Sequence, residues 1–505
     1  MEAFLHPLQG LAEFEEIKKR CGANCGILNV SGCMESQKVH LMYGLSGLFP
    51  YHLILADDER NAKEIYEDYR FYDKNVYFYP AKDLLFFQAD IHGNLLIRQR
   101  MRVIRALLEQ EEVTVVTSID GCMDFLMPLE KIRSRLLHFK SDSVIDLDQL
   151  KEELVELGYE RTGQVELPGQ FSVRGGIIDI YPLTEDNPWR IELWDDEVDS
   201  IRSFDAESQR SLENVDEITI YPAAEKMDGE DMVSFLDYFP EEKTLVFLDE
   251  LNHLAENGEG VEEEYRQSRM HREEKGEANL PEQWLCGFQE LQKKLNRRNC
   301  VAVSALSPRR SGWKINEEFD LTVKSVDSYN SSFELLVKDL LQYKSQGYRI
   351  ALLSGSRTRA ERLAKDLSEE GLNAFYSQDM DRIISPGEIM VVYGHARRGF
   401  QYPLIKFAVM TETDIFGKEQ KKRKKKKKYS GNRIQDFAEL SIGDLVVHEK
   451  HGLGIYRGIE KVEVDRVVKD YIKIEYRGGS NLYILATQLD ALQKYSGSSE
   501  NAKTP

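Results

Sequence analysis

The stretch that decides the fold is residues 174–183, RGGIIDIYPL, together with residues 190–205, RIELWDDEVDSIRSFD. Apolar and polar side chains alternate in both segments, which is the period of a strand with one buried face. Gly175-Gly176 and Asp195-Asp196 interrupt the alternation with residue types that favour turns. The pattern therefore predicts antiparallel strands joined by tight turns.

The second segment carries an unusual set of side chains on one face. Ile191 and Leu193 share the apolar face, so Arg190, Glu192 and Trp194 share the opposite one. Arg and Trp together are typical of the residues that dominate binding at protein interfaces. Two interpretations are open from the residues alone: a partner protein covers Trp194, or a neighbouring domain of the same chain does.

The segments on either side change to the pattern of an α/β protein. Short apolar runs at residues 51–56 (YHLILA) and 113–116 are separated by helical periodicity, and residues 245–251 (LVFLDEL) return to a strand pattern. Helices and strands alternate again over residues 332–411. Residues 443–495 combine short strands with Gly turns, which is typical of a small β-barrel. The sequence predicts a multidomain protein of mixed α/β and α+β class.

The length of 505 residues corresponds to several domains, at roughly 100 to 200 residues each. We predict an α/β domain in two parts, an inserted domain between them, a second small α/β domain, a basic flexible linker, a small β-barrel and a disordered tail. The predicted bounds are 1–135 and 221–325 for the two-part domain and 136–220 for the insertion. The second α/β domain is predicted at 326–416, the linker at 417–438, the barrel at 439–496 and the tail at 497–505.

The charge balance limits the classes of partner. With 67 Lys and Arg against 87 Asp and Glu, the net charge of −20 argues against a surface that wraps DNA. Residues 418–428, KEQKKRKKKKK, are the exception; self-repelling lysines predict an extended linker, with attraction to DNA as the alternative. Six cysteines are too few for a disulfide framework. A targeting leader and a long apolar run are both missing, so we expect a cytoplasmic protein with no membrane contact.

Signals for catalysis are weak. Residues 43–47 (YGLSG) precede a strand, but they continue as Leu48-Phe49-Pro50, where a phosphate-binding loop has its Lys followed by Ser or Thr. Asp249 and Glu250 end an apolar strand, where magnesium would be held, and without a lysine loop upstream we interpret them as a solvated strand end. His448 and His451 are three residues apart rather than four and are followed by glycine, so a zinc helix is not expected. We expect no catalytic residue, no cofactor and no metal.

The predicted barrel offers a second candidate surface. Val462, Val464 and residues 467–468 flank Asp465-Arg466, which indicates a hairpin, and Tyr471 begins a further strand pattern. Small barrels with an exposed β-branched edge bind partners by adding a strand to that edge. The alternative is that residues 462–468 form an ordinary core strand.

Two sets of motifs resemble known families. Residues 174–183, 190–205 and 208–211 (SQRS) closely resemble the domain shared by UvrB and the bacterial transcription-repair coupling factors. Residues 443–495, with HEKHGLGIYRGI, DYIKIEY and NLYILATQLDAL, are similar to the RNA-polymerase-interacting domain of the coupling factors, which is related to the CarD family and absent from UvrB. The resemblance implies a UvrB-like domain with a degenerate P-loop nucleotide site, an inserted UvrA-binding domain and a CarD/Tudor-like barrel.

The same resemblance implies which residues bind partners. The family's UvrA-binding surface falls on Arg174, Arg190 and Trp194, where Trp194 replaces the usual Phe. Both arginines are then expected to pair with carboxylates of UvrA. The strand that pairs with the β subunit of RNA polymerase falls near Val462, and with it we assign Val464 and Tyr471 to that contact. Leu485 stands where the family commonly has proline.

The predicted function is therefore recruitment without catalysis, as the N-terminal adaptor part of a coupling factor that binds UvrA and RNA polymerase. In the family an ATP-driven DNA translocase follows the polymerase-binding domain. It is missing from this sequence, so DNA contact is expected mainly through that part, and the chain is expected to be a monomer. Two alternatives stay open: a DNA-binding CarD-like transcription regulator, and an ATPase or helicase with an atypical nucleotide site.

Overall fold

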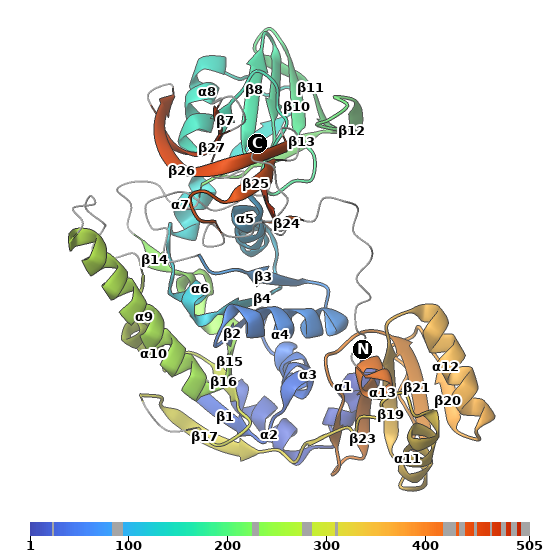
Figure 1. Ribbon diagram of the computed structural model, residues 1–505. Helices are drawn as coiled ribbons and strands as arrows, with labels where there is room; N and C mark the ends of the chain where they lie inside the picture. The colour runs from blue at the N-terminus through green and yellow to red at the C-terminus, as the bar shows by residue number, and fades with distance from the viewer. Residues whose placement is uncertain are drawn as a thin grey trace.

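The computed structural model shows a chain of mixed α/β class, as the sequence predicts (Figure 1). It describes residues 1–22, 25–82, 94–224, 232–274, 285–308, 312–417, 431–433, 440–448, 452–464, 467–475, 481–485 and 492–495. The predicted linker charge run at 418–428 and the tail at 497–505 lie outside these residues.

A seven-stranded parallel sheet forms the first α/β unit, in the order β17-β1-β16-β15-β2-β4-β3. The strands are β1 (Ile27–Ser31), β2 (Tyr51–Ala56), β3 (Val76–Tyr79), β4 (Val113–Ser118), β15 (Thr244–Asp249), β16 (Cys300–Val303) and β17 (Ile315–Asp320). The central strands are apolar and buried along almost their whole length, because helices cover both faces of a parallel sheet. These helices include α2 (Ala12–Cys21), α3 (Glu35–Ser46), α4 (Glu59–Tyr72), α5 (Asn94–Glu109) and α9 (Leu251–Glu274).

The sequence pattern predicts the strands β2, β4 and β15 but not β1 and β16. Both missed strands are short, at five and four residues, and β1 contains the polar Asn29 in its centre. Pairing of Ile27 with Cys300 and of Val30 with Val303 places the two strands side by side although the paired residues are 273 positions apart in the chain. The local sequence therefore gives little indication that these residues form strands. The polar Asn29 interrupts the apolar run of β1, and it is buried only because the neighbouring strands and helices cover it.

The middle domain is inserted between β4 and β15 and lies at the top of Figure 1. Its six-stranded sheet has the order β12-β11-β10-β9-β8-β7, antiparallel except for β7 with β8. The strands are β7 (Glu160–Arg161), β8 (Gln170–Arg174), β9 (Ile177–Ile180), β10 (Trp189–Trp194), β11 (Glu197–Phe204) and β12 (Ser211–Val215). Helix α8 (Leu147–Glu156) packs on the inner face, where Phe171, Ile178, Ile191 and Leu154 form the core.

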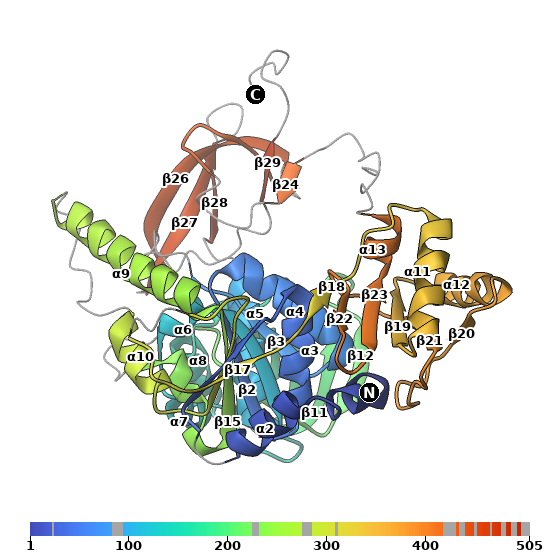
Figure 2. The same ribbon diagram turned by 90° about the horizontal axis from the view of Figure 1, so that it is seen from below.

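The second α/β unit has a sheet of order β18-β22-β23-β19-β21-β20 and two main helices, α11 (Phe333–Ser345) and α12 (Arg357–Glu369). Its strands are β18 (Lys324–Ser325), β19 (Arg349–Ser354), β20 (Asn373–Tyr376), β21 (Glu388–Tyr393), β22 (Phe400–Tyr402) and β23 (Phe407–Thr411). Figure 2 shows this unit beside the first one, with helix α1 (Glu2–Leu8) at the junction. Phe4, Met42, Leu353 and Phe407 belong to one continuous buried cluster, so the two units share a core.

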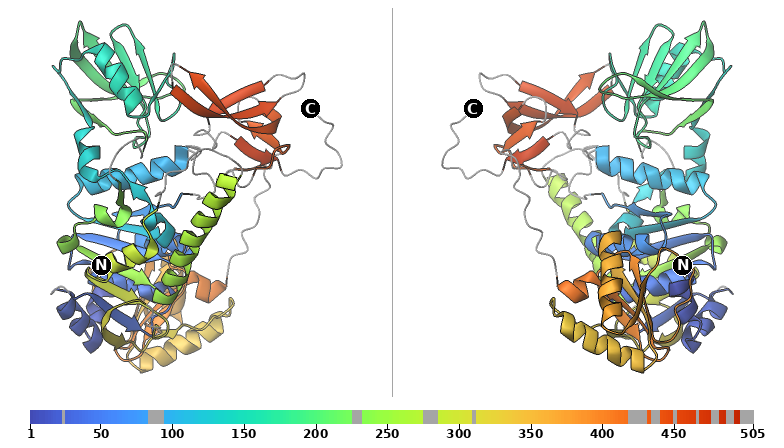
Figure 3. Two further views of the ribbon diagram at one scale, coloured as in Figure 1. Left: turned by 90° about the vertical axis from the view of Figure 1, so that its left-hand side faces the viewer. Right: turned by 90° about the vertical axis from the view of Figure 1, so that its right-hand side faces the viewer.

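The C-terminal sheet is antiparallel, in the order β24-β29-β25-β26-β27-β28. Its strands are β24 (Gly431–Arg433), β25 (Leu445–His448), β26 (Gly452–Val464), β27 (Val467–Glu475), β28 (Asn481–Leu485) and β29 (Leu492–Tyr495). Figure 3 shows this sheet on the side of the first α/β unit from which α9 projects. None of the helices in the described part of the chain has both the length and the apolar character needed to cross a membrane.

A buried histidine lies at the junction of the two α/β units. His40 of α3 has its Nε2 atom 3.0 Å from the carbonyl oxygen of Phe4 and its Nδ1 atom 3.1 Å from the hydroxyl of Tyr402. A carbonyl only accepts, so Nε2 carries the proton and Tyr402 donates to Nδ1. Burial lowers the pKa of His40 to about 4, and burial of His52 in the first unit does the same.

This pKa predicts a loss of stability in mild acid. The unfolded chain binds a proton near pH 6.5 while folded His40 stays neutral down to about pH 4, so stability is complete above pH 6.5 and falls as the pH drops towards 4. Between pH 7 and pH 5, His40 alone accounts for a loss of about 2 kcal/mol. Urea unfolding at both pH values is expected to show a smaller pH effect in His40→Gln than in the parent. The same change at the exposed His138 serves as the control, and equal pH effects in both variants would contradict the assignment.

Candidate partner-binding surfaces and a lysine–carboxylate site

The outer face of the middle sheet, opposite α8, carries the side chains singled out in the sequence. Residues that pair across antiparallel strands project to the same face of a sheet. One row across this face contains Ser172, Asp179, Arg190, Arg202 and Asn214, and the next contains Arg174, Ile177, Glu192 and Ser200. The alternation predicted for Arg190 and Glu192 is therefore confirmed, and Trp194 follows beyond a shift in the register of β10 with β11.

Trp194 is the most exposed aromatic side chain among the described residues, at 80%. It ends β10 and pairs with Glu197 across a tight turn in which Asp195 has a φ of 60°. Aspartate tolerates this left-handed conformation better than most residues. The interpretation that a neighbouring domain of the same chain covers Trp194 is wrong for this structure.

Asp179 organises the charges on the outer face. Its carboxylate is 1% exposed and accepts hydrogen bonds from Arg190 Nε at 2.6 Å and Nη2 at 2.9 Å, and from Arg174 Nη2 at 2.7 Å. A buried carboxylate needs such compensation, because an unpaired charge in the interior is very costly. The two arginines lie side by side because each bonds to the same aspartate.

Arg190 is held within the chain by several contacts. Its side chain is only 14% exposed, its guanidinium lies 4.4 Å from the centre of the Phe204 ring, and Nη2 also donates to Gln209 Oε1 at 3.1 Å. The hydrogen bonds to Asp179 raise the pKa of Arg190 above its usual value. Its Nε and Nη2 groups are therefore engaged within the chain.

Arg174 keeps most of its exposure. Its side chain is 46% exposed although it donates one hydrogen bond to Asp179. The neighbouring Glu192 is bound by Arg202 Nη1 at 2.8 Å, and this hydrogen bond lowers the pKa of the Glu192 carboxyl. Of the three residues that the resemblance assigns to the UvrA surface, Arg174 and Trp194 are therefore the accessible ones.

The second predicted surface lies in the C-terminal sheet. Val462 and Val464 lie in β26 and face Lys469 and Val467 of β27 in the pairing register, while Tyr471 of β27 pairs with both Glu460 and Leu485. The side chains of these residues lie outside the described part of the structure. The recorded pairing of β25 with β26 ends at Ile455, so within the described residues the Val462–Val464 end of β26 is paired on one side only.

A lysine–carboxylate site, formed by Lys38, Asp249 and Glu250, lies at the carboxyl ends of β1 and β15. Lys38 Nζ is 2.7 Å from Asp249 Oδ1 and 2.7 Å from Glu250 Oε1. Asp249 is 2% exposed and also accepts from Asn61 Nδ2 at 2.7 Å. Burial works to lower the pKa of Lys38, but the two carboxylates outweigh it and raise the pKa; burial raises the pKa of Asp249.

The interpretation of Asp249 as a solvated strand end without a lysine upstream is therefore wrong. Lys38 was not predicted as part of this site because β1 was not predicted. Gly32 follows β1 directly and Lys38 comes six residues later, which is the spacing of a phosphate-binding loop, so the signal for such a loop lies between Ile27 and Lys38. Residues 43–47, which the sequence suggested as the place for such a loop, lie in the last turns of α3 and its C-terminal cap.

The loop after β1 departs from a phosphate-binding loop at two places. Such a loop has Gly before its Lys and Ser or Thr after it, and this chain has the buried Gln37 and the buried Val39. Gln37 Nε2 donates to Tyr402 of the second α/β unit at 3.0 Å. Val39 has no hydroxyl for magnesium, and the ammonium of Lys38 is bound by two carboxylates. The loop keeps the Gly-to-Lys spacing of a phosphate-binding loop, and its lysine is paired with carboxylates of the same chain.

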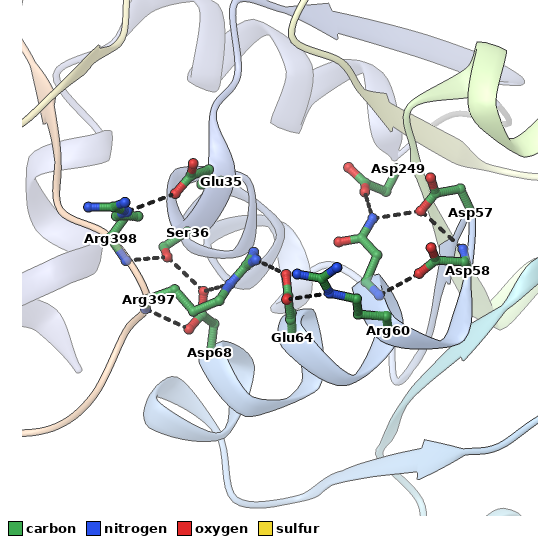
Figure 4. A network of polar contacts seen from close by, with 11 residues as sticks. Glu35, Ser36, Asp57, Asp58, Arg60, Glu64, Asp68, Asp249, Arg397 and Arg398 are labelled. Atoms are coloured by element: carbon green, nitrogen blue, oxygen red, sulfur yellow. Dashed lines mark hydrogen bonds and ion pairs between the residues drawn. The ribbon is translucent and has the colours of Figure 1, made fainter. Parts of the chain in front are cut away.

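The same loop is joined to the second α/β unit by a network of polar contacts (Figure 4). Ser36 Oγ donates to Asp68 Oδ2 at 2.7 Å and accepts from the backbone N–H of Arg398 at 3.1 Å. The backbone N–H of Arg397 donates to Asp68 Oδ1 at 2.9 Å, and its guanidinium is ion-paired with Glu64 and Asp68. Burial raises the pKa of Asp68. These contacts and the shared core hold the two units together.

The described residues contain no group of three or more His, Cys, Asp or Glu side chains able to hold a metal ion. Glu449 to His451 of the histidine motif lie outside the described residues.

Two segments of the chain, each containing one of the candidate surfaces, match known protein families. Residues 137–225 match the family described as the UvrB interaction domain, and residues 440–496 match the CarD-like/TRCF RID domain. The chain is 30% identical to a transcription-repair-coupling factor of Bacillus subtilis, over 93% of this chain and 46% of that protein. It is 27% identical to that of Staphylococcus aureus strain MRSA252, over 86% of this chain and 41% of the relative, and 28% identical to that of Staphylococcus epidermidis, over 89% and 43%.

The chain thus spans less than half the length of the curated relatives that it matches. The two family matches contain the two surfaces described above, with Arg174 and Trp194 in the first and Val462 in the second. The chain therefore carries a UvrB interaction domain and a CarD-like/TRCF RID domain, and is similar over most of its length to part of a bacterial transcription-repair-coupling factor.

Proposed function

We propose that this chain is the recruitment part of a transcription-repair coupling factor, binding UvrA through the outer face of the middle sheet and the β subunit of RNA polymerase through the C-terminal sheet. The observation that carries the proposal is the exposure of Trp194 within the segment that matches the UvrB interaction domain, which also contains the half-exposed Arg174. The adaptor performs no chemistry itself, and translocation along DNA would belong to a separate motor domain.

The outer face is organised for binding before a partner arrives. Asp179 holds Arg174 and Arg190, and β10 with its tight turn holds Trp194. An interface whose side chains are already ordered loses less conformational entropy on association. In this proposal Trp194 fills an apolar pocket on UvrA, and the exposed part of the Arg174 guanidinium binds a carboxylate of UvrA.

The polymerase contact is proposed as strand addition. The end of β26 that contains Val462 and Val464 pairs with β27 on one side, which leaves the backbone groups of the other side available among the described residues. A strand of the polymerase β subunit would add there through main-chain hydrogen bonds. Tyr471, opposite Glu460 in the register, is included in the proposed contact.

Two pull-downs with purified UvrA and purified RNA polymerase β subunit test the proposal. Arg174→Ala is expected to weaken capture of UvrA and leave capture of the polymerase subunit unchanged. Val462→Glu is expected to do the reverse, because a charge at the strand edge opposes pairing with another strand. Each variant serves as the control for the other.

Arg362→Ala is the matched control for the removal of an arginine, because Arg362 is 84% exposed and lies in the second α/β unit. If Arg174→Ala captures UvrA as well as Arg362→Ala does, the assignment of the outer face fails. If neither partner is captured by the unsubstituted chain, the proposed function fails as a whole. Gel shifts on bare DNA at two salt concentrations distinguish the adaptor from the alternative of a DNA-binding regulator. Binding of a regulator to DNA phosphates is expected to weaken steeply as the salt concentration rises.

A further inference from the structure

A cavity of about 470 Å³ lies at the amino-terminal edge of the seven-stranded sheet. Its walls are formed by the end of α3, the end of α4 and the first residues of β2 and β4. The strands are parallel, so this edge is opposite the one that carries the lysine–carboxylate site. None of the described residues that line the cavity belongs to either candidate surface. The volume lies within the range of small-molecule sites, which is about 300–1,000 Å³.

The charges around this cavity favour a cation. Asp73 and Glu112 are its acidic side chains, and neither forms an ion pair with another described residue. Helices α3 and α4 both end at the cavity, and the carbonyl end of a helix attracts positive charge. Among the described residues in its wall there is no Lys or Arg. The negative charge of the cavity therefore has no balancing cation from the lining residues.

His52 lines the same cavity and is neutral at physiological pH. The residue is 6% exposed, and burial lowers its pKa to about 4. Its Nδ1 atom is 3.2 Å from Thr114 Oγ1. The ring lies near the carbonyls of Ser46 and Phe49, yet Nε2 makes no hydrogen bond of normal geometry with a described residue. A buried polar atom without a partner is uncommon in native structures. When Nδ1 donates to Thr114, Nε2 is able to accept an N–H from a ligand.

Aromatic and apolar side chains in the wall select an organic cation over a metal ion. The rings of Tyr43 and Tyr72 are stacked, with their centroids 5.1 Å apart and an angle of 20° between their planes. Leu48 and Phe49 also line the cavity. Ring faces attract cations, and apolar side chains cover a carbon chain. A metal ion prefers several charged or polar ligands, and no suitable group of three occurs among the described residues.

We propose that this cavity binds an aliphatic diamine or polyamine. The ammonium groups of the ligand bind the carboxylates of Asp73 and Glu112, and His52 Nε2 accepts a further N–H. The carbon chain lies against Tyr43 and Phe49. Hydrogen bonds between an ammonium group and a carboxylate are among the strong ones, because both partners are charged. This site is independent of the proposed recruitment function.

Titration calorimetry of the full chain with spermidine, at constant ionic strength, tests this site. The double variant Asp73→Asn with Glu112→Gln removes both carboxylates, and asparagine keeps the acceptor that Asp73 offers to the backbone N–H of Asn75 at 2.8 Å. We expect the Kd for spermidine to rise at least about tenfold in this variant. The matched control, Asp199→Asn with Glu370→Gln, removes two exposed charges elsewhere and is expected to leave the Kd unchanged.

A thermal melt without ligand checks that each variant is folded. If Asp73→Asn disturbs the end of α4, Glu112→Gln alone at its exposed position gives the same test with a smaller rise in Kd. Equal weakening in both double variants would show attraction to the overall negative charge of the chain and would overturn the proposal. Failure of the unsubstituted chain to bind spermidine would do the same. Magnesium chloride is the second titrant, and magnesium binding that disappears with Asp73 and Glu112 would identify a metal site instead.

Discussion

Replacement of Lys38 by methionine is expected to lower the free energy of unfolding of the seven-stranded unit by about 3–5 kcal/mol. Lys38 is the cation that compensates Asp249, which is 2% exposed, and the neighbouring Glu250. Methionine has a similar length but no charge, so the two carboxylates would stay in the interior without it. Urea unfolding, monitored by the fluorescence of the first unit, measures the change in the free energy of unfolding.

The control is Lys63→Met, which removes a surface lysine paired with Glu59 one helical turn away. Such a pair contributes about 0.3–0.5 kcal/mol, so its loss is expected to change the midpoint little. Adding Asp249→Asn and Glu250→Gln to Lys38→Met is expected to restore part of the stability, because no uncompensated charge then remains. A midpoint of Lys38→Met equal to that of Lys63→Met would contradict the role of Lys38.

The same measurement tests the ATPase alternative. A ligand that binds the folded state raises its stability in proportion to the logarithm of ligand concentration over Kd. Magnesium with ATP is expected to leave the midpoint of the unsubstituted chain unchanged, because Lys38 is bound by carboxylates and Val39 offers no hydroxyl. A nucleotide-dependent rise that disappears in Lys38→Met would favour a working nucleotide site.

Replacement of Trp194 by alanine is expected to weaken the affinity for UvrA by about 30-fold or more, which corresponds to about 2 kcal/mol. The melting temperature is expected to stay the same, because an 80% exposed side chain contributes little to the folded state. Titration of UvrA by calorimetry and a thermal melt give the two readouts. Leu306→Ala is the control, since Leu306 is also 80% exposed and lies in the first α/β unit.

Arg190→Ala is expected to behave differently from Trp194→Ala. Removal of Arg190 takes two hydrogen bonds from the buried Asp179 and should lower the melting temperature together with the affinity. Arg190→Ala with an unchanged melting temperature and lost UvrA binding would show that Arg190 contacts the partner directly. Unchanged affinity in Trp194→Ala would remove Trp194 from the proposed interface.

Local patterns in the sequence were sufficient for much of the fold. Alternation in residues 190–205 predicted both the strands β10 and β11 and the side chains on their outer face, because neighbouring side chains of a strand always point to opposite faces. Apolar runs predicted β2, β4 and β15. The five residues of β1 were not predicted as a strand, and the loop that ends at Lys38 was therefore not predicted either.

The character of the outer face and the two motif-bearing segments could be predicted, since both depend on residues near one another in the chain. Which charged side chains are paired within the chain depends on the folded structure. Lys38 meets Asp249 across 211 residues, because a parallel sheet brings the carboxyl ends of distant strands together. Arg190 meets Asp179 across two paired strands and is occupied there, whereas Trp194 stays exposed. Charge compensation depends on these distant contacts, and the local period of the sequence does not contain them.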